Sequence, residues 1–379
     1  MAQKLHETAQ ARKRVFIVSI SDSKKRDGSQ AGSDSGREIH GLAETLELES
    51  VGWELVRIRE RSAKFGMGTG KAAEIAEKAA SLEADALVFD WEPNPSQQRN
   101  WEELSGLPVI DRQELIIRIF SQRAATREAD LQVQLAGLNY RLPRLAHKYI
   151  DLSRQRGGRY GTKGSGETLL ETDRRQIEAR IHVLEKEIDN IVKQRQVQRR
   201  QREKQGVPVC AIVGYTNAGK SSLLNALTGA SVLVEDKLFA TLDATTRRFQ
   251  PVPGMTVLLT DTVGFIRRLP HSLVKAFHST LEEASHANLL IHVLDAADPE
   301  ADECFRTTVS VLGELGAGSI PVITVLNKID RLDETQIQTM LSGFEGSVAV
   351  SVKEGNGLKD LKTAIAEKLK QDCQETSVS

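Results

Sequence analysis

Several kinds of residue that mark special classes of protein are scarce in this sequence of 379 residues. The three cysteines (Cys210, Cys304 and Cys373) are odd in number and form no C-x-x-C pair, which argues against a disulfide framework or a zinc site. No apolar run exceeds the length of a strand, and the polar N-terminus lacks the apolar stretch of a signal peptide. These absences predict a cytoplasmic chain without a membrane segment, in a reducing compartment.

The remaining composition is that of a globular protein with two to three domains. Aromatic residues make up only 4%, so the core must consist mainly of Leu, Ile, Val and Ala, within an ordinary 40% hydrophobic and 27% charged content. The 51 basic and 52 acidic side chains nearly cancel, but they are unevenly distributed. Residues 141–206 hold 17 basic and nine acidic side chains, so the rest of the chain is acidic.

Alternating strand and helix patterns predict an α/β fold with three parts. Residues 15–112 form the first part, an N-terminal α/β domain with strands at 15–20, 53–58 and 86–89 and helices near 39–50 and 70–82. Pro93 and Pro95 are expected in a loop of that domain. Residues 207–371 form the last part, where apolar runs at 207–213, 255–260, 289–294 and 321–326 suit strands buried on both faces of a mostly parallel sheet.

The middle part, residues 113–206, reads as an antiparallel helical hairpin. Leucines at 131, 135, 138, 142 and 145, and apolar residues at 177, 181, 184, 188 and 191, give each arm one apolar seam. Pro143 predicts a break late in the first arm. Between the arms lies the glycine-rich, basic stretch Arg154–Gly166, which suits contact with RNA phosphates; a solvated connector is the alternative, with binding carried by the basic helix end Lys193–Lys204.

A phosphate-binding loop is the most specific motif in the sequence. Gly214-Tyr-Thr-Asn-Ala-Gly-Lys-Ser221 follows an apolar strand and opens a helix, the context that G-x-x-x-x-G-K-[ST] requires. Backbone N–H groups there would surround phosphate oxygens, Lys220 would reach the β- and γ-phosphates, and Ser221 would bind Mg²⁺. The alternative interpretation is a glycine turn between strand and helix without a bound phosphate. The motifs that follow favour the phosphate-binding loop over this alternative.

Two further motifs lie at the ends of apolar runs. Asp261-Thr-Val-Gly264 resembles the second carboxylate motif of GTPases, with Asp261 near the metal and the Gly264 amide near the γ-phosphate. Asn327-Lys-Ile-Asp330 resembles the guanine-reading N-K-x-D motif, in which a carboxylate accepts two hydrogen bonds that adenine cannot donate. Taken singly, each also reads as a strand-end or helix-capping Asp. Ser351-Val-Lys353 resembles a weaker base-cradling motif.

A threonine between Lys220 and Asp261 should close on Mg²⁺ when the γ-phosphate is present. Spacing leaves Thr241, Thr245 and Thr246 as candidates.

Over nearly all of its length beyond about residue 42, the sequence resembles HflX, the ribosome-associated GTPases of the Obg–HflX group. The resemblance lies in Pro95–Asn100, Val109–Arg112, Arg127-Glu128, Gly164–Thr168 with Glu171–Arg175, Phe239–Asp243 and Asp261–Ile266. It implies GTP hydrolysis with Mg²⁺ and binding to the large ribosomal subunit and its rRNA, in splitting, rescue or biogenesis of ribosomes. We expect the protein to be a monomer. It also implies that Thr241 is the metal-binding threonine and that residues 239–243 are the first switch.

The implied site residues fall into three groups. Lys220, Thr241 and Gly264 act in catalysis, and Ser221 and Thr241 hold the metal. The nucleotide contacts are Gly214, Tyr215, Thr216, Asn217, Ala218, Gly219, Lys220, Ser221, Ser222, Phe239, Ala240, Thr241, Leu242, Asp243, Asp261, Thr262, Val263, Gly264, Asn327, Lys328, Ile329, Asp330, Ser351, Val352 and Lys353. Asn217 is also a candidate for recruiting K⁺, as it does in some related GTPases.

The chain departs from the family pattern at a few positions. Ser165 and Ala244 stand where the family usually has proline, and Phe265 stands where Ras-like enzymes place a water-orienting Gln, which predicts slow hydrolysis unless the ribosome activates it. Gly66–Lys71 suits a glycine turn before a helix better than a second phosphate loop, because no Ser or Thr follows Lys71. A GTP-regulated RNA-binding module, with incidental hydrolysis, is the alternative function.

Overall fold

The computed structural model describes residues 13–22, 35–145, 165–204, 206–230, 235, 237–267 and 283–376. Its contacts divide the chain into two compact units: unit 1 comprises residues 1–119 and 137–179, and unit 2 comprises residues 120–136 and 180–379. Three long helices have residues in both units, so the division into parts at 112 and 206 stays a prediction.

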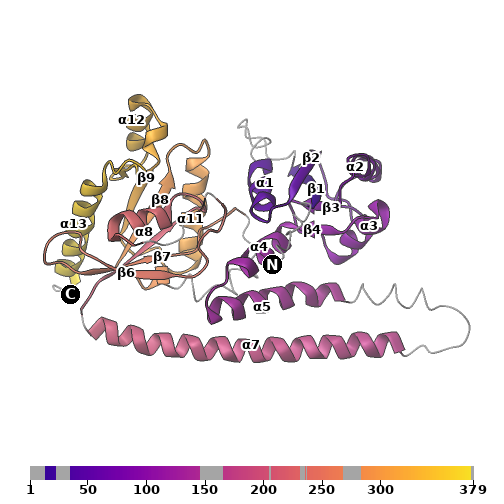
Figure 1. Cartoon of the computed structure of the whole chain (residues 1–379), viewed down its shortest axis with the longest axis horizontal. Helices are drawn as coiled ribbons and strands as arrows, with labels where there is room; N and C mark the ends of the chain where they lie inside the picture. Colours follow the sequence, from indigo (N-terminus) through magenta and orange to yellow (C-terminus); the bar gives the residue numbers. More distant parts are fainter. Residues whose placement is uncertain are drawn as a thin grey trace, which may run out of the picture. The chain divides into compact units, whose positions relative to one another are not determined.

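The sheet of unit 1 is parallel, with strand order β2-β1-β3-β4 (Figure 1). Its elements are β1 (Arg14–Asp22), α1 (Ser35–Thr45), β2 (Glu49–Ile58), α2 (Thr69–Ser81), β3 (Ala86–Phe89), α3 (Pro95–Ser105) and β4 (Val109–Asp111). The expected helix at 39–50 is too long at its C-terminal end, because Glu47 takes a left-handed φ of 59° and β2 then begins at Glu49.

The loop expected around Pro95 is also wrong in part, since α3 begins at that proline. Asn94 accepts a hydrogen bond from the Gln97 N–H (2.8 Å), and the Gln97 side chain accepts one from the Asn94 N–H (3.0 Å). Proline suits the first position of a helix because an N–H at that position would have no acceptor within the helix, so its absence costs no hydrogen bond. A capping box therefore starts the helix at the point where the prolines alone indicated a loop.

A cluster of aromatic rings lies in the core of unit 1. Phe89 lies between Trp91 and Trp101, with ring centroids 4.3 and 4.9 Å away, and the Trp101 Nε1–H donates to the Phe65 carbonyl (3.0 Å). Gly66 precedes α2 with a φ of 77°, and Lys71 forms ion pairs with Glu54 and Glu74. The interpretation of Gly66–Lys71 as a turn before a helix agrees with this arrangement.

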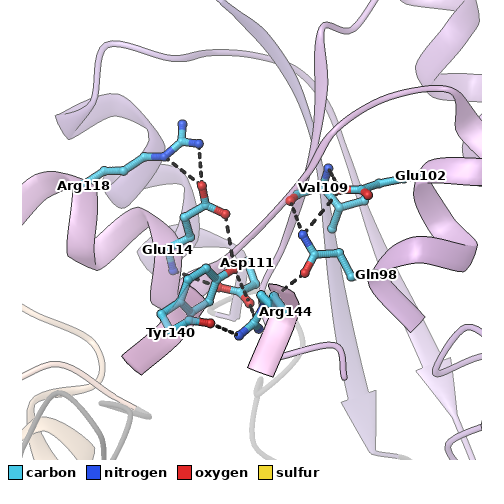
Figure 2. Close-up of polar contacts among 8 residues, drawn as sticks. All are labelled: Gln98, Glu102, Val109, Asp111, Glu114, Arg118, Tyr140 and Arg144. Atoms are coloured by element: carbon cyan, nitrogen blue, oxygen red, sulfur yellow. Dashed lines mark hydrogen bonds and ion pairs between the residues drawn. The ribbon is translucent and has the colours of Figure 1, made fainter. Parts of the chain in front are cut away.

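A buried polar cluster fixes the end of β4 within unit 1 (Figure 2). Asp111 accepts hydrogen bonds from the Glu114 N–H (2.8 Å) and the Tyr140 hydroxyl (3.1 Å), and it pairs with Arg144 at 2.8 Å. Arg144 also donates to Gln98 (3.0 Å). The Gln98 and Asp111 side chains, which lie in two of the family's characteristic stretches, thus hold the last strand against the start of the helical region.

The helical region confirms a helix at each of the two predicted seams and the break at Pro143, although Leu142 and Leu145 of the first seam lie past the C-terminal end of its helix. It contains α4 (Arg112–Arg123), α5 (Arg127–Arg141), the short 3₁₀ helix η1 (Leu142–Arg144) and the single 40-residue helix α7 (Ser165–Lys204) (Figure 1). Within unit 2, Arg195 pairs with Glu128 (2.8 Å) and Arg180 donates to Gln134 (3.1 Å), so α5 and α7 run antiparallel there. Of the predicted RNA-binding stretch Arg154–Gly166, residues 154–164 lie outside the described residues.

Unit 2 contains a six-stranded sheet with the order β10-β9-β8-β5-β7-β6, parallel except for β6 (Figure 1). Its elements are β5 (Val209–Gly214), α8 (Lys220–Thr228), β6 (Thr245–Phe249), β7 (Val257–Asp261), β8 (Leu289–Asp295), α11 (Ala301–Glu314), β9 (Val322–Asn327), η2 (Ile329–Arg331), α12 (Glu334–Gly343), β10 (Val348–Ala349) and α13 (Leu358–Thr376). The four predicted apolar strands are confirmed, and α/β with a mostly parallel sheet is the observed class.

The core of this sheet is aliphatic, as the scarcity of aromatics predicts. β5 and β8 are buried along nearly their whole length, and α13 packs Leu361, Ile365 and Leu369 against the same core. The Cys210 and Cys304 side chains are buried. None of the helices in the described ranges is long and apolar enough to cross a membrane.

Candidate nucleotide-binding site

The loop from β5 to α8 has the backbone shape that a phosphate site requires. Gly214 and Gly219 have φ values of 144° and 94°, and Asn217 has a φ of 60°. A Cβ atom at Gly214 would collide with the Val293 backbone of β8, so only glycine fits between these strands. The loop ends at Lys220, the first residue of α8, so the backbone N–H groups of the helix start face the loop.

Lys220 is buried beneath this loop. Its Nζ donates a hydrogen bond to the Tyr215 carbonyl (2.8 Å). Burial lowers the pKa of Lys220 to about 8, and Asp261 opposes that shift. An ammonium group stripped of water in this way gains strongly from an anion beside it.

Three predicted residues from separate segments meet next to Lys220. The Ser221 Oγ lies 2.6 Å from the Thr241 Oγ1 and donates to the Asp261 Oδ2, also at 2.6 Å. Asp261 is fully buried, and among the described residues its other oxygen, Oδ1, has no hydrogen-bond partner. Burial raises the pKa of Asp261, against the influence of Lys220 and Ser221. The cluster therefore contains a carboxylate that is unfavourable to bury, because one of its oxygens has no hydrogen-bond partner among the described residues, and two hydroxyls lie beside it.

The structure separates Thr241 from the other two threonine candidates. Thr245 and Thr246 lie in β6, where the Thr246 hydroxyl is 2.9 Å from that of Thr260 on the neighbouring strand. Thr241 alone among the three is hydrogen-bonded to Ser221. The carboxylate–hydroxyl geometry thus singles out a residue that spacing left open.

The segment after Asp261 lies directly against the phosphate loop. The Thr216 N–H donates to the Phe265 carbonyl (2.7 Å), and the Phe265 N–H donates to the Gly214 carbonyl (3.1 Å). A Cβ at Gly264 would come within 2.7 Å of both the Lys220 Nζ and the Thr216 Cα. Glycine is therefore required at position 264 by close approach. Phe265 is 1% exposed and points into the core.

Two residues of the N-K-x-D motif donate hydrogen bonds to backbone carbonyls of the phosphate loop. The Asn327 Nδ2 donates to the Ala218 carbonyl (2.8 Å), and the Lys328 Nζ donates to the Asn217 carbonyl (2.9 Å) and pairs with Asp295 (2.7 Å). Lys328 has a φ of 65°, which turns the chain out of β9. Asp330 follows in the short 3₁₀ helix η2, four residues past the apolar run.

Asp330 accepts a hydrogen bond from the Ser351 hydroxyl (2.7 Å), which lowers its pKa. The Val352 N–H donates to the Asn327 side chain (3.3 Å). The weak Ser351–Lys353 motif therefore joins the N-K-x-D segment.

The pocket in front of these motifs contains some residues that sequence reasoning missed. Besides the phosphate loop, residues 239–241 and Gly264, it is lined by Glu235, Lys237, Lys328 and Arg331. Asp261, Asp330 and Lys353 do not line it. Arg331 directly follows Asp330, so a charge next to the motif was the one available signal; Glu235 and Lys237 lie in a stretch without a pattern.

Together, the phosphate loop, the strand-end carboxylate and the N-K-x-D segment on a mostly parallel sheet define a P-loop GTPase domain. Three family models match successive stretches: "GTP-binding GTPase N-terminal" over residues 33–121, "GTP-binding GTPase Middle Region" over 123–202 and "50S ribosome-binding GTPase" over 209–328.

Relatives in sequence agree with these models. The GTPase HflX of Akkermansia muciniphila is 48% identical, covering 96% of this chain and 86% of that protein, and the GTPase HflX of Escherichia coli is 45% identical, covering 81% and 72%. A crystal structure of a GTP-binding protein from Sulfolobus solfataricus with GDP is 24% identical at a TM-score of 0.47, covering 95% of this chain and 99% of that one. The chain belongs to the HflX family of GTPases.

Proposed function

We propose that this chain is a Mg²⁺-dependent GTPase that binds the large ribosomal subunit in a nucleotide-gated cycle and acts in ribosome splitting, rescue or biogenesis. The observation that carries the proposal is the meeting of Ser221, Thr241 and Asp261 beside Lys220. The family description "50S ribosome-binding GTPase" supports the choice of partner. The proposal places a monomeric protein in the cytoplasm, partly on ribosomes.

The residues present suit Mg²⁺, which prefers oxygen ligands and keeps several waters. Ser221 and Thr241 would hold the ion through their hydroxyls, and Asp261, which accepts a hydrogen bond from Ser221, would lie near it. Bound there, the metal would neutralise charge on the β- and γ-phosphates. Lys220 would bind the same phosphates, and the backbone N–H of Gly264 would meet the γ-phosphate.

Base recognition falls to the N-K-x-D segment, whose Lys328 lines the pocket. Asp330 would accept two hydrogen bonds from guanine, with Ser351 orienting its carboxylate through the observed 2.7 Å hydrogen bond. Asn327 and Lys328 would support the phosphate loop beneath the nucleotide. Asn217, which lines the pocket, would recruit K⁺.

Hydrolysis by the chain alone should be slow. The buried Phe265 has no group that could orient an attacking water, and its backbone is hydrogen-bonded to the phosphate loop. Ribosome binding would then supply the ordering that this position lacks. The surplus of basic side chains in residues 141–206 supports rRNA as the surface that is bound.

Co-sedimentation with large ribosomal subunits tests the proposal. Wild type should sediment with a non-hydrolysable GTP analogue and much less with GDP or without nucleotide, and ribosomes should raise its GTPase rate. Lys220→Ala should lose the nucleotide dependence. A rate that ribosomes leave unchanged, with Thr241→Ala still completing binding and release, would favour the RNA-binding module with incidental hydrolysis.

A further inference from the structure

Glu235 and residues 237–243, the segment that carries Thr241, contact the junction between α4 and α5 through Glu235, Phe239 and Asp243. We call Phe120, Arg123, Ala125 and Thr126 the α4–α5 corner; all four belong to unit 2, as does the segment. The contact has three parts: an ion pair from Arg123 to Glu235, a ring contact between Phe120 and Phe239, and hydrogen bonds to Asp243.

Asp243 caps the start of α5. Its Oδ2 accepts hydrogen bonds from the N–H groups of Ala125 (2.9 Å) and Thr126 (3.2 Å), and its Oδ1 accepts one from the Thr126 hydroxyl. The Thr126 Oγ1 in turn accepts from the Ala129 N–H (3.2 Å). A carboxylate at this place satisfies orphan donors and complements the helix dipole. The helix start is thus completed by a residue more than 100 positions away.

Phe239 is held in a conformation that it would not adopt alone. Its φ is 55°, which is strained for a bulky side chain, and its ring is 2% exposed. The ring packs edge-on against Phe120, with centroids 4.7 Å apart and an interplanar angle of 85°. The backbone N–H of Phe239 donates a hydrogen bond to the Thr216 hydroxyl (2.9 Å). Such strain persists only where the surroundings impose it, so the corner and the phosphate loop together fix this residue.

Thr241 lies between these two tethers. Its hydroxyl reaches Ser221 from a segment fixed two residues earlier by Phe239 and two residues later by Asp243. We propose that the α4–α5 corner positions Thr241 for the metal, with Phe120 and Thr126 as positioning residues and Asp243 as the link to helix α5. This inference rests on the proposed role of Thr241.

The coupling should work in both directions. A change in the stability of the start of α5 changes the affinity of the site for Mg²⁺ and triphosphate. Because the coupling is reciprocal, binding of the triphosphate changes the stability of the start of α5 by the same free energy. α5 is tied in turn to α7 by the ion pair between Glu128 and Arg195 (2.8 Å), in which Glu128 is buried. The corner therefore connects the nucleotide site to both helical arms.

The test measures the Mg²⁺ concentration needed for half-maximal binding of a fluorescent GTP analogue by the full chain. Thr126→Val and Phe120→Leu should each raise it about tenfold, the effect of about 1.4 kcal/mol, and leave GDP affinity within about twofold of wild type. Thr126→Ser should restore the wild-type value. Combining Thr126→Val with Asp243→Ala should add little to the Asp243→Ala effect, because the two side chains share one contact.

Asp333→Ala is the matched control, since Asp333 caps α12 by accepting a hydrogen bond from the Gln336 N–H (2.8 Å) without touching Glu235 or residues 237–243. It should leave the Mg²⁺ requirement unchanged. If Thr241→Ala raises the requirement but Thr126→Val does not, the positioning role is wrong and the metal site stands. If Thr241→Ala has no effect, the metal role of Thr241 fails, and this inference fails with it.

Discussion

The two sheets of this protein place carboxylates at the same position and use them in opposite ways. In unit 1, Asp90 follows β3 and Asp111 ends β4; in unit 2, Asp261 ends β7. Asp90 pairs with Arg112 (2.7 Å) and Asp111 with Arg144 (2.8 Å), whereas Asp261 meets the Ser221 hydroxyl and keeps one buried oxygen without a partner among the described residues.

The difference lies in the hydrogen-bonding partners that surround each carboxylate. A guanidinium satisfies a carboxylate fully with directed hydrogen bonds, so such a pair fixes neighbouring elements. Hydroxyls satisfy it only in part, which leaves room for a metal ion. At the carboxyl edge of the sheet, the aspartates of unit 1 form structural ion pairs, which we call the clamp, whereas Asp261 of unit 2 belongs to a candidate ligand site. The neighbouring side chains, rather than the carboxylates themselves, make this difference.

The largest expected effect comes from breaking the clamp in unit 1. Arg112 is 4% exposed and also pairs with Glu38, so Arg112→Met leaves two acidic groups without their cation. We expect a loss of about 3–5 kcal/mol in the free energy of unfolding. All three tryptophans (Trp53, Trp91 and Trp101) lie in unit 1, so their fluorescence in urea reports it.

The matched control is Arg118→Met, which removes a 44% exposed arginine that pairs with Glu114 and should cost less than about 1 kcal/mol. Equal losses in the two variants would contradict the idea of a buried clamp.

The second prediction concerns pH. Burial raises the pKa of Asp111 from 3.8 to about 6, despite Arg144 and Tyr140. The folded state holds the Asp111 proton more tightly than the unfolded state does, so protonation stabilises the fold. This contribution to the free energy of unfolding is fully present below about pH 4 and is lost as pH rises through 6. It amounts to about 3 kcal/mol. Asp111→Asn should remove this dependence, so its difference from wild type, followed by tryptophan fluorescence, should change between pH 4 and 7. A constant difference would refute it.

The third prediction tests whether Asp330 is open to a ligand. Asp330→Asn should weaken GTP binding at least about 100-fold, because the guanine donors lose a charged acceptor. Xanthosine triphosphate, whose changed edge suits an amide, should bind the variant better than GTP does, and a nucleotide titration measures both. Unchanged GTP affinity would show that Asp330 does not read the base.

The smallest effect should come from a hydroxyl that belongs to the sheet. Thr246→Val removes the 2.9 Å contact with Thr260 across β6 and β7 and should change stability by less than about 1 kcal/mol. Its Mg²⁺ requirement for binding the GTP analogue should match wild type. A raised requirement would make Thr246, rather than Thr241, the candidate metal ligand.

The buried strands were predictable because they leave an apolar signal. β5, β7, β8 and β9 are covered on both faces, so their sequences are continuous apolar runs, and the motifs at their ends follow. β6 was missed, since its sequence Thr-Thr-Arg-Arg-Phe is polar and lies at the sheet edge. α3 was missed because a capping box outweighed its prolines.

Within the candidate site, motif spacing predicts residues that are close in sequence, but not contacts made by folding. The choice among Thr241, Thr245 and Thr246 depended on where β6 begins, which no local pattern shows. Glu235 and the α4–α5 corner were missed for the same reason, because their contacts join segments more than 100 residues apart. The roles of all these residues stay predictions.

The length of α7 has a mechanical consequence. At 1.5 Å per residue, its 40 residues measure about 60 Å from end to end. A tilt of about 5° at one end of such a rod displaces the other by about 5 Å. Arg195, which is tied to Glu128, lies nine residues from the C-terminal end, so the helix is a lever with a short arm beside that ion pair and a long arm toward Ser165.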